Sequence, residues 1–168
     1  MNLNYRFESE DTPPIRLRLK IEINTTEHLT ELGVEQYPVK VGTPRFSGEA
    51  GVTSFSLPAL LGTKPRALYQ RKKGCDLFDL WFAIAQRGDL DLEYLLRCFH
   101  RYMREGGHWV SRTRFEENLH RKGEDPDFHA DVKPLLRSTI DWDFDGAMVA
   151  VREQLIERLP GHTWAGRP

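Results

Sequence analysis

Residues 56–84 read SLPALLGTKPRALYQRKKGCDLFDLWFAI, and this stretch says most about both the fold and the chemistry of the chain. Ser56 suits a helix N-cap and Pro58 a first helical turn. We expect one helix over residues 56–70, kinked at Pro65, and a second helix over residues 76–85. The chain therefore changes from strands to helices at this point.

The same stretch separates its charges. It carries five cations with no acid among them: Lys64, Arg66, Arg71, Lys72 and Lys73. Two carboxylates, Asp76 and Asp79, follow and open the next apolar run. Concentrated cations beside spaced carboxylates are typical of a site for a polyphosphate and its metal ions.

Upstream of this stretch, the pattern indicates strands. Residues 15–24, IRLRLKIEIN, alternate strictly between apolar and polar side chains. Shorter strands are expected at residues 5–7, 35–41 and 52–55, with a Gly/Pro-rich loop over residues 42–51. Strands followed by helices predict an α+β fold, with a β-rich part at residues 1–56 and a helical part at residues 57–168 packed as one compact domain.

Composition narrows the class of protein. The chain has 168 residues, a formal net charge of -1 and two cysteines, which are too few for a disulfide framework. No stretch has the length and apolar character of a signal peptide or a membrane span. We expect a soluble, cytoplasmic protein.

Two stretches resemble the AbiEii/AbiGii-type nucleotidyltransferase toxins of bacterial abortive-infection and toxin–antitoxin systems, which serve phage defence. They are RLKIEINTTEH at residues 18–28 and LLGTKPRALYQRKKGCDLFDLWFA at residues 60–83. The resemblance implies a partial DNA-polymerase-β-like nucleotidyltransferase sheet followed by a helical C-terminal region. It also implies Mg²⁺-dependent transfer of a nucleoside monophosphate from an NTP to an RNA hydroxyl, with tRNA as the expected acceptor and a cognate antitoxin as partner.

The chain departs from this family in one respect. Members carry, upstream of these motifs, a Gly-Ser pair and then an Asp-x-Asp that supplies the main metal ligands. The Asp-x-Asp pairs of this chain, at residues 89–91, 125–127 and 141–143, do not follow a Gly-Ser and do not lie on a predicted strand. We therefore expect a C-terminal portion of a longer enzyme, inactive alone, with an exposed sheet edge that a second copy of the chain covers.

The resemblance assigns roles to particular residues. Glu22 would be a metal-binding carboxylate on the strand, and Lys20 beside it would contact a nucleotide phosphate. Lys64 would neutralise the triphosphate as the bond to pyrophosphate breaks, supported by Asp79 and Asp76. Arg66 and Arg71 would bind phosphates of the nucleotide or the RNA.

Each role has a simpler alternative, which for Lys64 is an ordinary surface lysine and for Arg66 and Arg71 a solvated basic face. Glu22 and Lys20 are also explained as neighbouring charges on a solvent-exposed strand face. Asp76 and Asp79 also suit the cap and first turn of a helix. Two other functions remain open: a non-enzymatic RNA- or protein-binding remnant that uses the basic residues 64–73, and a metal-dependent nuclease built around Glu22 and Lys20.

Overall fold

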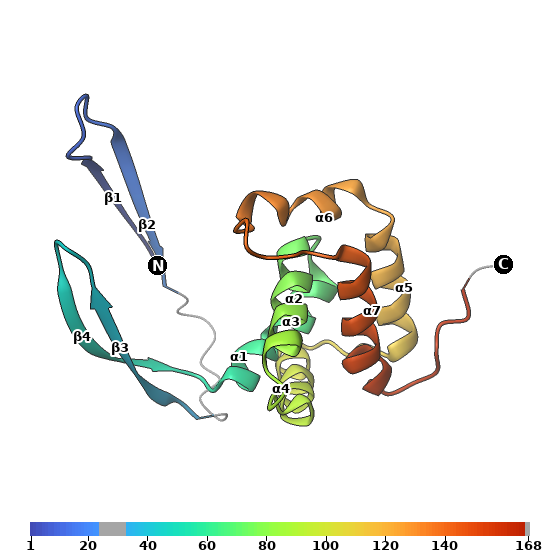
Figure 1. Ribbon diagram of the computed structural model, residues 1–168. Coiled ribbons are helices and arrows are strands. Elements are labelled where there is room, and N and C mark those ends of the chain that lie inside the picture. The colour runs from blue at the N-terminus through green and yellow to red at the C-terminus, as the bar shows by residue number, and fades with distance from the viewer. Residues whose placement is uncertain (24–32, 167–168) are drawn as a thin grey trace. The chain divides into compact units, whose positions relative to one another are not determined.

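The structure is a computed structural model that describes residues 1–23 and 33–166 of the chain (Figure 1). It divides into two compact units, Met1–Glu31 and Leu32–Pro168. Strands come first and helices follow, so the predicted α+β class is confirmed.

The first unit contains an antiparallel hairpin of β1 (Asn2–Glu8) and β2 (Arg16–Glu22). The alternation predicted for β2 is present, and the register brings apolar residues of the two strands opposite each other: Leu3 with Ile21, Tyr5 with Leu19, and Phe7 with Leu17. These six side chains form one apolar face, yet each keeps between 36% and 51% of its surface exposed. The hairpin therefore has an apolar face that its own two strands do not bury.

A second hairpin pairs β3 (Glu35–Gly42) with β4 (Ser47–Ser54). The expected loop over residues 42–51 is wrong, because the turn is confined to residues 43–46 and β4 begins at Ser47. Thr43 and Phe46 close this turn, with the Thr43 backbone N–H donating to the Phe46 carbonyl at 2.8 Å. Gly51 lies opposite Pro38 in the register, so glycines that suggested a loop instead sit within a ladder. Among the described residues, the four strands form two separate two-stranded sheets.

The helical part begins with α1 (Leu57–Leu61) and α2 (Thr63–Gln70), which replace the single kinked helix that we expected. The break falls at Gly62, not at Pro65. Pro65 occupies the first turn of α2, where its missing N–H would have no helical partner in any case. A Cβ on Gly62 would lie 2.5 Å from the Cβ of Cys98, so close packing requires glycine there.

The remaining helices enclose the core. They are α3 (Gly74–Gln86), α4 (Leu92–Glu105), α5 (Arg112–Gly123), α6 (Pro126–Ala130) and α7 (Phe144–Gln154), with 3-10 turns η2 (Lys133–Leu135) and η3 (Ile156–Arg158). Helix α3 packs between α2 and α7, and α4 packs against α1 and α2 (Figure 1). Residues with less than 2% of their surface exposed form the centre of this core: Leu68, Leu77, Leu80, Leu95, Phe99, Phe115, Val151 and Leu155.

Hydrogen bonds at the start of α5 cap this helix and join it to the segment after η3. Ser111 is the N-cap, and its side chain accepts a hydrogen bond from the Arg114 backbone N–H. Thr113 instead donates its hydroxyl to the His162 carbonyl, and Glu116 accepts the Trp164 backbone N–H at 2.6 Å. The segment after η3 is thus fastened along α5.

Among the described helices, none combines the length and apolar character needed to cross a membrane.

Candidate functional site

Lys64 is the centre of the site that the structure assembles. It lies in the first turn of α2, with its Nζ 2.6 Å from Asp79 Oδ2 and 3.7 Å from Asp76 Oδ1. The two carboxylates are three residues apart on α3, which places them on one helix face. Lys64 and Asp79 keep 30% and 39% of their side-chain surface exposed, so a ligand can reach both.

Asp76 has a different surrounding from Asp79. Its side chain is fully buried, and Arg71 binds it in a bidentate manner, with Nε 2.6 Å from Oδ2 and Nη2 2.7 Å from Oδ1. A buried carboxylate needs such paired donors to offset its desolvation. The N-cap position of α3 is Lys73, so Asp76 lies in the first turn and is not the cap. Asp76 therefore joins the end of α2 to the start of α3.

The pKa of Lys64 follows from these neighbours. Partial burial by itself would lower the pKa of the ammonium. The hydrogen bond and charge of Asp79, together with the charge of Asp76, outweigh the burial, so the pKa is raised above its usual value. Lys64 is therefore a fixed, fully charged cation at neutral pH, as phosphate binding requires.

Lys72 and Lys73 of the basic stretch are neutralised by acids that are distant in the sequence. Lys72 forms an ion pair with Asp125, and Lys73 Nζ lies 3.0 Å from Asp131 Oδ1. Asp131 also accepts the Cys75 backbone N–H at 3.4 Å. Asp125 is the N-cap of α6 and Asp131 its C-cap. The packing of α6 therefore brings acids next to Lys72 and Lys73, whose own stretch of sequence contains none. Arg66 places its guanidinium 5.7 Å from the centre of the Tyr102 ring.

Lys122 is a site neighbour that the sequence analysis missed. It is 7% exposed and donates its ammonium to the carbonyls of Leu68 and Tyr69 in the last turn of α2. Burial lowers its pKa to about 8, partly opposed by the charge of Asp76. Its burial could have been predicted from its position in the sequence, because Lys122 continues the apolar stripe of Phe115 and Leu119 at helical spacing.

Glu22 and Lys20 lie on β2 and form an ion pair with each other. The hydrogen bond from Lys20 lowers the pKa of Glu22. Glu22 belongs to the unit Met1–Glu31 and Lys64 to the unit Leu32–Pro168, so the joint role that the resemblance implies for them stays a prediction. Residues 24–28 of the matching motif lie outside the described residues.

The described carboxylates do not fit an Mg²⁺ site. Within residues 1–23 and 33–166, no group of three or more His, Cys, Asp or Glu side chains is placed to hold a metal ion. Asp76 is bound by Arg71, and Asp79 is bound by Lys64. Members of the Asp-x-Asp pairs occupy helix N-cap positions instead: Asp91 on α4, Asp125 on α6 and Asp143 on α7.

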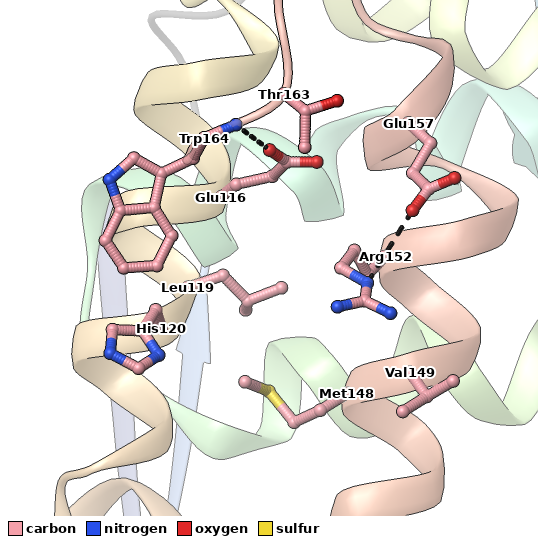
Figure 2. A pocket seen from close by; sticks show the side chains of 9 residues that line it. All are labelled: Glu116, Leu119, His120, Met148, Val149, Arg152, Glu157, Thr163 and Trp164. Carbon is pink, nitrogen blue, oxygen red and sulfur yellow. Dashed lines mark hydrogen bonds and ion pairs between the residues drawn. The ribbon is translucent and has the colours of Figure 1, made fainter. Parts of the chain in front are cut away.

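A hydrophobic pocket of about 230 Å³ lies elsewhere, between α5, α7 and the C-terminal segment (Figure 2). Leu119, Met148 and Val149 form its apolar lining, and Trp164 and Arg152 line it on opposite sides. Arg152 Nε lies 3.7 Å from Glu157 Oε1. None of the site residues predicted from the sequence lines this pocket.

These observations define an α+β protein with a candidate phosphate-binding lysine at the start of a helix. A family model described as "Nucleotidyl transferase AbiEii toxin, Type IV TA system" matches residues 1–150. The chain therefore belongs to this family of nucleotidyltransferase toxins, and the resemblance noted above is confirmed. No curated protein and no solved structure shows significant similarity to the chain.

Proposed function

We propose that this chain carries the phosphate-binding part of an enzyme that transfers a nucleoside monophosphate from an NTP to an RNA hydroxyl. The observation that supports this most is the Lys64 ammonium, kept charged and partly exposed by Asp79. Such a cation can stabilise the charge that develops on pyrophosphate as it leaves. Family membership implies a nucleotide substrate and an antitoxin partner, and tRNA is the acceptor that we propose.

Asp79 and Asp76 act on Lys64 in different ways. Asp79 orients the ammonium from the exposed side, at 2.6 Å. Asp76, with Arg71, fixes the junction between α2 and α3 from the buried side. We therefore propose that Asp79 belongs to the reactive site and that Asp76 and Arg71 position it. Arg66 and Lys20 would contribute secondary contacts to nucleotide or RNA phosphates.

The family is typically metal-dependent, and Mg²⁺ neutralises triphosphate charge when bound. In a polymerase-β-like sheet, Glu22 would be one of its ligands. Because the described carboxylates do not fit a metal site, we assign no step to the metal. We propose that the 168-residue chain alone binds NTP weakly and transfers no nucleotide. Adding an upstream segment with Gly-Ser and Asp-x-Asp should create activity.

The test is incorporation of labelled nucleotide into bulk RNA by the chain alone and by a version with the added segment. In the extended version, Lys64→Ala and Asp79→Ala should each abolish labelling. Asp89→Ala is the matched control, since this exposed aspartate pairs only locally with Arg87 at 3.1 Å. Asp76→Ala should lower the free energy of unfolding by about 1–3 kcal/mol, because it removes the two charge-assisted hydrogen bonds that join Arg71 to α3.

Two results would contradict the proposal. Strong Mg²⁺-dependent labelling by the 168-residue chain alone would show that it already holds a complete site. Unchanged labelling by Lys64→Ala in the extended version would remove Lys64 from the site. The second candidate, a non-enzymatic remnant binding RNA through residues 64–73, is less well supported, because Lys72 and Lys73 are paired with acids of the α6 region.

A further inference from the structure

A second pocket, with Arg104 and two histidines in its lining, lies where α4 ends. It measures about 410 Å³ and is lined by His100, Met103, Arg104, His108, Trp109, Val110 and Pro160. This volume lies in the range of about 300–1,000 Å³ that is usual for small-ligand sites. The lining contains three basic or titratable nitrogen side chains and no carboxylate.

The backbone holds this pocket in a defined shape. Helix α4 ends in a Schellman motif, in which the His108 N–H donates to the Met103 carbonyl at 2.9 Å and the Gly107 N–H to the Arg104 carbonyl at 2.9 Å. Gly107 has a φ of +70°, which favours glycine at that position. The next residues are thereby set in place, and Val110 is anchored in the core at 2% exposure.

Trp109 is the unusual member of the lining. Its side chain is 65% exposed, although it directly precedes the buried Val110. Within the part of the chain that the structure describes, neither Arg104 nor His108 forms an ion pair. An exposed indole can stack on a base, while the neighbouring Arg104 and His108 side chains can donate hydrogen bonds to the adjacent phosphate.

We propose that this pocket binds an unpaired nucleotide of a single-stranded nucleic acid, with the base stacked on Trp109 and the phosphate held by Arg104 and His108. The proposal rests on the proposed function in one respect: a strand held here would be the RNA acceptor. It also explains how RNA could be bound although four of the five basic residues in the stretch 64–73 are paired with acids. Helix α4 carries the pocket and packs directly against α2, the helix of Lys64.

The test is equilibrium binding of a fluorescently labelled single-stranded 12-nucleotide RNA to the full chain, measured by anisotropy without NTP. Trp109→Ala should weaken binding roughly tenfold through loss of one stacked base. Arg104→Ala should weaken it and reduce the steepness of its salt dependence by about 0.7 in log–log slope. Trp164→Ala and Arg152→Ala, the same residue types at the pocket of Figure 2, are the matched controls and should leave binding unchanged.

Binding measurements with other nucleic acids identify the class of ligand. Single-stranded DNA binding as tightly as RNA would support a site that reads base and phosphate, and tighter RNA binding would add recognition of the 2′-hydroxyl. Equal binding of a blunt duplex would overturn the proposal, since a duplex offers no free base to stack. Unchanged RNA affinity in both pocket variants would also overturn it and would leave the pocket to a protein partner. Because no NTP is present, these outcomes do not depend on whether the enzyme transfers nucleotides.

Discussion

At the residue scale, the buried Lys122 shows how a charged side chain of one helix, α5, can cap the C-terminal end of another helix, α2. Its ammonium donates to two carbonyls in the last turn of α2, where unpaired carbonyls and the helix dipole favour a cation. The same burial that places it there lowers its pKa to about 8. Lys122 therefore helps to fix the end of α2, next to the start of α3. Its charged form is destabilised by desolvation.

This low pKa predicts a rise in stability at alkaline pH. Between pH 8 and pH 10.5, the unfolded chain keeps the Lys122 proton that the folded chain has lost. The free energy of unfolding should therefore increase through this window, by up to about 3 kcal/mol. Urea unfolding of the native protein and of Lys122→Met, measured from pH 7 upward, isolates the contribution as the difference between the two curves. Parallel curves would contradict the prediction.

At the element scale, glycines decide how closely α2 and α3 approach their neighbours. Gly74, the first residue of α3, lies so near the Phe128 backbone that an added Cβ would overlap the carbonyl oxygen. Gly62 plays the same part between α1 and α4. The position of α3, and with it the distance between Lys64 and Asp79, thus depends on the absence of a side chain at Gly74.

Gly74→Ala should accordingly lower the free energy of unfolding by about 1–3 kcal/mol, because the backbone of α6 cannot move away as a side chain can. Gly88→Ala is the control, since a Cβ there meets nothing within 4 Å and the backbone is not left-handed. That variant should be neutral or slightly stabilised. Chemical denaturation of both variants measures the difference, and equal stabilities would show that α3 can shift without cost.

At the scale of the whole molecule, the β1–β2 hairpin presents an apolar face on one side and a charged face on the other. Leu17, Leu19 and Ile21 each keep at least 40% of their surface exposed. Apolar side chains gathered on one face of a two-stranded sheet favour association with another apolar surface.

We expect this face to produce concentration-dependent self-association of the chain. Leu19→Glu should shift the sedimentation coefficient toward that of the monomer, because it places a charge in the middle of the apolar face. Arg6→Glu, on the opposite face of the same hairpin, should leave it unchanged. A native protein that stays monomeric at every concentration would contradict this expectation.

Much of the fold follows from the local sequence. The alternation of residues 15–24 predicted β2, and the apolar run opened by Asp76 and Asp79 predicted α3. Local patterns suffice there because side-chain period and backbone geometry are linked within a single element. The same signals misplaced the break between α1 and α2 and the start of β4. In both places glycines act through tertiary packing or strand pairing, which no local pattern contains.

The sequence by itself determined the family, the order of strands and helices, and the candidate trio of Lys64, Asp76 and Asp79. Only the tertiary structure decided that Asp76 is buried and bound by Arg71, and that the more exposed Asp79 forms the closer ion pair with Lys64. It also decided that Lys72 and Lys73 are paired with acids. The physical reason is distance along the chain. Lys73 and Asp131 are 58 residues apart, and their charges meet only because α6 packs against the start of α3.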